Sequence, residues 1–170
     1  MKRLNHSLIL LALVSATAFA QSPISKLAAD AKADWNEIKA TLVKAAEKMP
    51  EADYAFKPTP TVRSYGEEVA HAADVQTMIC ALVTGSGAKQ VTGKTKKADL
   101  IAYLQASNAE CDKAFAGITD ATAADVVKLP WMSHTKLGVL QYNTGHSNET
   151  YGTMVVYLRL KNQVPPTSQK

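Results

Sequence analysis

Apolar residues recur every three or four positions in four separate stretches of the chain, the pattern of helices that bury one face. The first predicted helix runs from Pro23 to about Met49; Ser22 can cap its start, and Pro50 ends it. Its apolar stripe consists of Leu27, Ala31, Trp35, Ile38, Leu42, Ala45 and Met49. Such a continuous stripe predicts one long helix that packs against other helices.

Two further helices are predicted in the middle of the chain. The second begins at Ser64, which can form a capping box with Glu67, and ends at Gly85-Ser86-Gly87. The third runs from about Thr95 to Phe115. The inward positions of these two helices are Val69, Ala72, Ala73, Gln76, Ile79 and Val83, then Leu100, Ile101, Leu104, Asn108, Cys111 and Phe115.

A fourth helix is predicted from about Lys136 to Lys161, and its inward stripe is polar in the middle. The stripe is Val139, Asn143, His146, Thr150, Met154, Tyr157 and Leu160. Burying polar groups without partners costs about 1–3 kcal/mol each, so partners on other helices are expected. No stretch shows a convincing alternating strand pattern, and the sequence therefore predicts an all-α four-helix bundle.

Two histidines near the middle of predicted helices, His71 in the second and His146 in the fourth, are candidates for one shared polar site. Bundles build metal sites from side chains on facing helices, although either histidine alone is more often a hydrogen-bonded core residue. His134 is expected in a loop as an exposed or capping residue. Zinc takes three or four protein ligands, so acidic neighbours would have to contribute. These neighbours are Glu149 beside His146, and Glu67, Glu68 and Asp74 around His71.

Residues 1–20 have the features of a cleavable export signal. Two basic residues precede the apolar run Leu8–Val14, and Ala18-Phe19-Ala20 is the small-residue pattern that signal peptidase reads. The run is too short to span a bilayer; a retained N-terminal anchor is the alternative. The expected mature protein is a single domain, residues 21–170, located in the periplasm or outside the cell and free of the membrane.

The composition of the expected mature region excludes one large class of partners. Without the two basic residues of the leader, 17 Lys and Arg remain against 15 Asp and Glu, and they are spread along the chain. A nucleic-acid-binding face is therefore not expected. The two cysteines, Cys80 and Cys111, would make a disulfide reasonable in an oxidising compartment, although not required.

Two sequence blocks carry a family resemblance. They are Val62-Arg63-Ser64-Tyr65-Gly66-Glu67-Glu68-Val69-Ala70-His71 and His146-Ser147-Asn148-Glu149-Thr150-Tyr151-Gly152. In this order and separation, and with residues 156–161 and 164–166, they resemble the DinB/YfiT-like superfamily of bacterial four-helix proteins, most of all its exported members. The resemblance spans nearly the whole expected mature region. It implies an up-down-down-up bundle and a divalent metal ion held by three histidines.

The implied ligands are one histidine on the second helix and an H-x-x-x-H pair on the fourth. They map to His71, His146 and the position of Thr150, where a neutral hydroxyl is a poor ligand for such a metal. Glu149 could substitute, although it points about 100° around the helix from Thr150. The resemblance thus implies an incomplete site for zinc, nickel, iron or manganese.

The function implied by this resemblance is the binding of a metal ion or a small molecule in the bundle pocket of an exported protein. The alternative is a metal-dependent thiol transferase or hydrolase of the cell envelope, in which the metal lowers the pKa of a bound thiol or water. A third alternative is a structural protein that forms homodimers through its helices.

The implied topology also bears on the cysteines. Parallel second and third helices need a long crossover, and residues 84–95 are long enough to provide it. Cys80 lies 16 residues after Ser64, and Cys111 lies 16 residues after Thr95. In parallel helices these positions are level, so the topology implies a Cys80–Cys111 disulfide.

Overall fold

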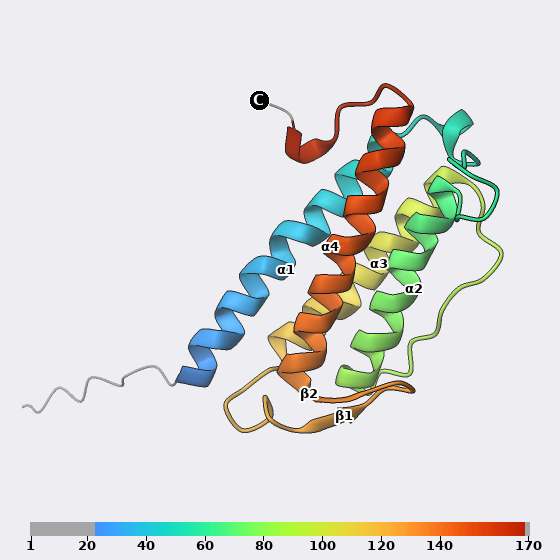
Figure 1. Ribbon diagram of the computed structural model, residues 1–170. Helices are drawn as coiled ribbons and strands as arrows, with labels where there is room; N and C mark the ends of the chain where they lie inside the picture. Colours follow the sequence, from blue (N-terminus) through green and yellow to red (C-terminus); the bar gives the residue numbers. More distant parts are fainter. Residues whose placement is uncertain (1–22, 169–170) are drawn as a thin grey trace, which may run out of the picture.

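Four long helices lie side by side and form the body of the protein (Figure 1). The computed structural model describes residues 23–168; the expected leader (residues 1–20) and the cap Ser22 lie outside the described residues. The helices are α1 (Pro23–Lys48), α2 (Tyr65–Thr84), α3 (Lys97–Ala116) and α4 (Lys136–Leu160). These bounds agree with the predicted helices to within about two residues, which confirms the all-α bundle.

The order of directions is up-down-down-up. In Figure 1, α1 and α4 ascend while α2 and α3 descend, and residues 85–96 return alongside α2 to connect the two parallel helices. Gly85 turns the chain at the end of α2 with φ +71°, a backbone conformation that favours glycine. The Gly85 N–H donates to the Ala81 carbonyl at 2.8 Å and closes the last helical turn.

The disulfide implied by this topology joins α2 to α3. Cys80 and Cys111 are bonded, their Cα atoms lie 4.9 Å apart, and both side chains are fully buried. The cross-link therefore lies inside the bundle, where it holds the two parallel helices in register.

The start of α2 is held by the predicted capping box. The Glu67 N–H donates to Ser64 Oγ at 3.2 Å, and the Ser64 N–H donates to Glu67 Oε2 at 2.6 Å. These contacts, together with Lys57 Nζ at 3.0 Å, lower the pKa of Glu67 to about 2. The preceding connection, which contains the short 3-10 helix η1 (Glu51–Asp53), is thereby docked onto the top of α2.

A small β-hairpin precedes α4 and corrects the expectation that the chain has no strands. β1 (Val126–Lys128) pairs antiparallel with β2 (Ser133–Thr135), with Val127 opposite His134. Each strand has three residues and only Val127 among them is buried, so no alternating pattern is long enough to be recognised. Thr135 also caps α4, because its Oγ1 accepts from the Gly138 N–H at 3.0 Å.

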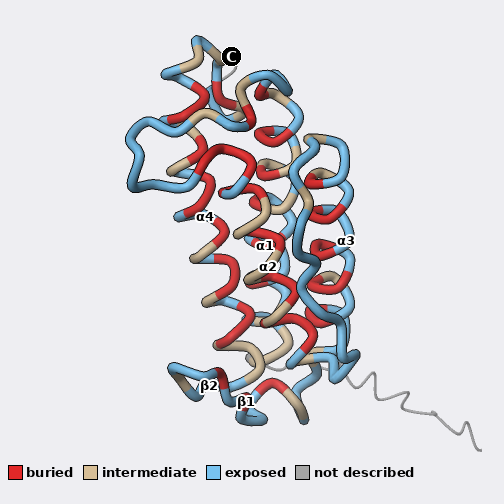
Figure 2. The backbone as a smooth tube through the Cα atoms, turned by 90° about the vertical axis from the view of Figure 1, so that its right-hand side faces the viewer, coloured by how far each residue is buried: buried red, intermediate tan, exposed pale blue. Residues whose placement is uncertain are grey.

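Buried positions follow one side of each helix, whereas the hairpin and the 85–96 segment are mostly exposed (Figure 2). Trp35 stacks on Phe115 with ring centroids 5.8 Å apart and donates its Nε1–H to Asp112 at 2.8 Å. Two predicted core residues are exposed, Leu27 by 58% and Leu160 by 55%, because both lie near helix ends, and Val83 and Ile101 are only partly buried. None of the described helices is long and apolar enough to cross a membrane.

The polar middle of α4 meets polar partners from α2 and α3. Ser107 Oγ donates to Gln76 Oε1 at 2.7 Å, and Gln76 Nε2 donates to Ser147 Oγ at 3.3 Å. Asn143 Nδ2 lies 3.7 Å from the sulfur of Cys111, while its fully buried Oδ1 has no partner among the described residues. Of the polar positions in the fourth stripe this layer contains Asn143, together with Ser147, which the stripe did not include.

Candidate functional site

The structure brings His71 of α2 and His146 of α4 together where these two antiparallel helices face each other. Their Nε2 atoms lie 3.1 Å apart, and the rings meet edge to face with centroids separated by 4.9 Å. At this distance the Nε2–H of one ring donates a hydrogen bond to the Nε2 lone pair of the other, so the two neutral rings are different tautomers. The two histidines that the sequence singled out therefore form one site.

The separation of the two nitrogens is close to that of two ligands on one metal ion. Imidazole nitrogens bound to one tetrahedral zinc ion at about 2.0–2.1 Å lie roughly 3.3 Å apart. The observed 3.1 Å differs from this by a few tenths of an ångström. Small side-chain adjustments are thus sufficient for both nitrogens to contact the same ion.

Both imidazoles are neutral near pH 7. The pKa of His71 is lowered to about 4, mainly by burial. The positive charge of Arg63 and the neighbouring His146 also lower this pKa, whereas the negative charges of Asp74 and Glu149 raise it. Burial likewise lowers the pKa of His146; Glu149 opposes this effect and Arg63 adds to it. Because only a neutral imidazole offers a lone pair to a metal, the pair is in the protonation state that ligation needs.

The position of the third implied ligand does not complete the site. Thr150 is buried, and its Oγ1 donates to the His146 carbonyl at 3.0 Å, so its proton is used within α4. Across residues 23–168, no three His, Cys, Asp or Glu side chains gather in a group that could hold a metal ion. Two histidines fit a metal ion, and a third protein ligand is not in place.

The three acidic candidates around His71 have other partners, whereas the Glu149 carboxylate forms no hydrogen bond or ion pair with the residues that the structure describes. Glu67 belongs to the capping box, and Asp74 accepts from the Tyr103 hydroxyl at 2.7 Å. Glu68 is buried, which raises its pKa, and its nearest cation is Arg63 at 3.7 Å. Glu149 is exposed and acts on both imidazoles only through its charge. His134 lies apart from the pair, exposed in β2.

Arg63 is the site residue that sequence reasoning missed. It lies in the connection before α2, where helical periodicity assigns no direction to a side chain. It lines a cavity of about 440 Å³ beside His71, together with Lys57, Glu67 and Asp74. The available signal was its rarity: it is one of two arginines after residue 20, and it immediately precedes the capping box.

The depressed histidine pKa values predict a loss of stability in mild acid. Between the unfolded pKa of about 6.5 and the folded value of about 4 for His71, the unfolded chain binds more protons than the folded chain. The free energy of unfolding should therefore fall as the pH is lowered from 7 to 5. His71→Gln, which removes the titrating ring and keeps a polar side chain, should lose less stability over this interval in urea melts.

The matched control for this experiment is His134→Gln, which removes an exposed histidine from the hairpin. It should show the same pH dependence as the unmodified protein. Equal losses of stability for His71→Gln and His134→Gln would show that the histidine pair does not carry the effect.

Comparison with known proteins agrees with this architecture. No curated protein matches the chain. Two solved DinB-like proteins have similar structures. The one from Bacillus subtilis has a TM-score of 0.68 at 17% identity and covers 83% of this chain and 99% of its own. The one from Bacillus cereus has a TM-score of 0.68 at 15% identity and covers 80% of this chain and 93% of its own.

A more distant similarity is to a mycothiol-dependent maleylpyruvate isomerase, with a TM-score of 0.53 at 14% identity. The match covers 79% of this chain and 60% of the isomerase, so it concerns the shared fold. At the level of sequence, the model of the DinB superfamily matches residues 34–154, a span that includes both histidines and most of the four helices. This protein belongs to the DinB superfamily.

Proposed function

We propose that this protein binds one divalent transition-metal ion between His71 and His146 and leaves the other coordination positions to water or a small-molecule ligand. The observation that carries the proposal is the 3.1 Å separation of the two Nε2 atoms. The neutrality of both rings supports it. Paired imidazoles favour zinc, nickel or iron over magnesium and calcium, which prefer oxygen ligands.

The histidine pair needs one proton to move before both nitrogens can bind. In the hydrogen-bonded pair one ring carries its proton on Nε2, whereas ligation through both Nε2 atoms requires both protons on Nδ1. The first ring therefore changes tautomer through solvent, and the site releases no net proton. When bound, a divalent ion lowers the pKa of a coordinated water or thiol.

Arg63 offers one cationic group beside the pair. It lines the cavity of about 440 Å³ next to His71, together with Asp74 and with Lys57, which is paired with Glu67 at 3.0 Å. The Arg63 guanidinium is always protonated and can hold a carboxylate or phosphate through two hydrogen bonds. A ligand with one anionic group could thus contact Arg63 while another of its groups approaches the histidines.

We also propose that the protein acts outside the cytoplasm, after removal of residues 1–20. The buried Cys80–Cys111 disulfide supports this location, because disulfides persist in oxidising compartments. Cleavage after Ala20 would leave Gln21 as the first residue of the mature chain.

A second candidate function is a metal-dependent reaction of a thiol, which the similarity to the mycothiol-dependent isomerase favours. Cysteine and glutathione serve as probes in a thermal-shift assay with and without zinc. A stabilisation that requires the metal and disappears in His71→Gln would support this candidate, and no shift with either thiol would count against it.

Metal binding is tested by titrating the mature protein with zinc and nickel in a calorimeter. We expect one equivalent to bind, and we expect His71→Gln to bind at least about 10-fold more weakly, because an amide is a poor ligand for these ions. Mass spectrometry of the exported protein checks in the same preparation that the chain begins at Gln21.

The control for the titration is His134→Gln, which removes a histidine outside the pair. It should bind the metal as the unmodified protein does. Equal binding by His71→Gln and the unmodified protein would refute the role of the pair.

A further inference from the structure

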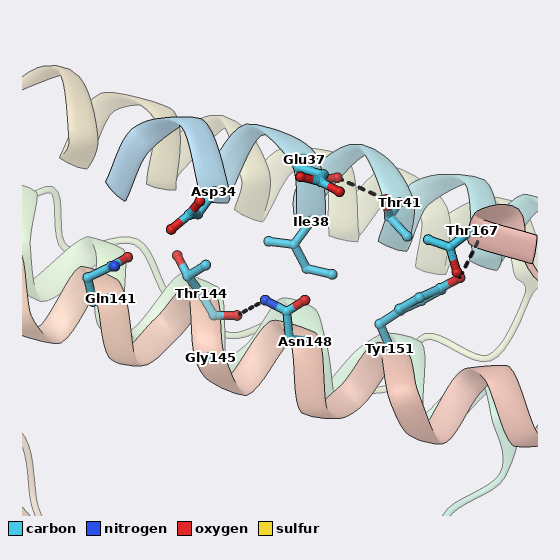
Figure 3. A pocket seen from close by; sticks show the side chains of 10 residues that line it. All are labelled: Asp34, Glu37, Ile38, Thr41, Gln141, Thr144, Gly145, Asn148, Tyr151 and Thr167. Carbon is cyan, nitrogen blue, oxygen red and sulfur yellow. Dashed lines mark hydrogen bonds between the residues drawn. The ribbon is translucent and has the colours of Figure 1, made fainter. Parts of the chain in front are cut away.

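A second cavity lies between α1 and α4 and has no lining residue in common with the cavity beside His71. Its volume is about 410 Å³, within the usual range of small-molecule sites. Figure 3 shows side chains of both helices facing this α1/α4 groove, with Asp34 pointing across toward Thr144, Ile38 in the middle and Tyr151 at the far end. Two rigid helices therefore form its walls.

The groove presents several hydrogen-bond acceptors, beside the amide groups of Gln141 and Asn148. Thr41 donates its hydroxyl proton to the Glu37 carbonyl at 2.9 Å, and Thr144 donates to the Leu140 carbonyl at 3.2 Å. The Asn148 amide NH₂ donates to the Thr144 carbonyl at 3.0 Å. The side-chain oxygens of all three residues keep lone pairs that can accept from a ligand.

The charge of the groove is negative. Asp34 and Glu37 lie one turn apart on α1, and no lysine or arginine lines the groove. In the part of the chain that the structure describes, neither carboxylate takes part in an ion pair. Tyr151, whose hydroxyl bonds Thr167 at 2.8 Å, adds an aromatic wall, and aromatic faces attract cations.

One glycine, Gly145, forms part of the α4 wall of the groove. A Cβ added there would meet no atom within 4 Å, so packing within the described protein does not require glycine. Glycine in a helix interior costs about 1 kcal/mol relative to alanine. A longer side chain at this position would extend into the groove.

We propose that the α1/α4 groove binds an organic cation with two or more ammonium groups. Its N–H groups can donate to the acceptors of the groove, its charges match Asp34 and Glu37, and its methylene chain can lie against Ile38 and Tyr151. The expected mature chain carries more basic than acidic residues, so its net charge does not attract polycations. The attraction comes from this groove and is independent of the metal proposal.

The test is calorimetric titration of the metal-free protein with spermidine. The variant Gly145→Gln fills the groove, and Gly152→Gln is the matched control, because Gly152 lies seven residues later on α4, also has open space at its Cβ and lies outside the groove. We expect Gly145→Gln to weaken binding at least about 10-fold, a change of 1.4 kcal/mol. Gly152→Gln should bind spermidine as the unmodified protein does, and melting curves check that both variants are folded.

A second variant tests the charge without filling the groove. Asp34→Asn should also weaken spermidine binding, and it keeps the proposal testable if Gly145→Gln does not fold. A neutral polyol such as sorbitol is the comparison ligand and should not bind. Absence of spermidine binding, equal binding by both glycine variants, or tighter binding of sorbitol than of spermidine would overturn the proposal.

Discussion

Thr150→His is expected to raise the affinity of the protein for zinc or nickel by at least about 100-fold, because loss of a residue that merely orients a metal ligand already costs about 10- to 100-fold. Position 150 lies one turn after His146 on α4 and is 4% exposed, on the side that packs into the bundle. The threonine hydroxyl is bonded to the His146 carbonyl and contributes no charge or strong lone pair to the site. A histidine there would add the third nitrogen that the pair lacks, and calorimetric titration measures the gain.

The control for this variant is Thr153→His, which adds a histidine to the same helix. Its Cα is about 10.5 Å along the helix from that of His146, at 1.5 Å per residue, which is too far for one shared ion. If the larger ring at position 150 prevents folding, Thr150→Asp offers a carboxylate of nearly the same volume as threonine. If both variants fold and neither binds the metal more tightly than the unmodified protein, a side chain at position 150 does not reach the ion held by the two Nε2 atoms.

Reduction of the Cys80–Cys111 disulfide is expected to lower the free energy of unfolding by about 3–4 kcal/mol. The cysteines are 31 residues apart, and closing a loop of this size restricts the unfolded chain by about that amount in the chain-entropy account. The bonded sulfurs are fully buried, so a change of this size should shift the urea midpoint clearly. Urea melts of the same protein with and without a strong reductant measure this loss of stability.

The double variant Cys80→Ala/Cys111→Ala is the control for the reductant. It has no cross-link to lose, so its urea melts should be the same under both conditions. A thiol count on the denatured protein checks that reduction is complete. Identical melts of the reduced and oxidised protein would show that the cross-link does not contribute to stability.

The helices and the capping box of α2 could be predicted from the sequence because they depend on neighbours within a turn or two. The capping box at Ser64 and Glu67 is a local exchange of hydrogen bonds, and the structure contains it. The stop at Gly85 likewise requires only a residue that adopts positive φ. The periodic stripes failed at Leu27 and Leu160 because a stripe does not show where the neighbouring helices end.

The pairing of His71 with His146 was only in part a property of the sequence. Helical spacing indicates that both residues lie mid-helix on polar faces, but a distance between side chains 75 residues apart depends on how α2 and α4 pack. The same packing decides the pKa of each ring, because burial is the largest cause of both shifts. The position of Arg63 near the two histidines could not be predicted from periodicity, because Arg63 lies in a connecting segment and not in a helix.

By itself, therefore, the sequence determined the four helices, the capping box of α2, the polar stripe of α4 and, through its family resemblance, the up-down-down-up order. Only the tertiary structure decided that two imidazole nitrogens lie 3.1 Å apart and that the Thr150 hydroxyl donates to the His146 carbonyl on its own helix. It also decided that Thr41, Thr144 and Asn148, which line the α1/α4 groove, donate to carbonyls of their own helices. The physical reason is that helix formation is governed by contacts within one or two turns, whereas the chemistry of a site depends on side chains that meet across helices.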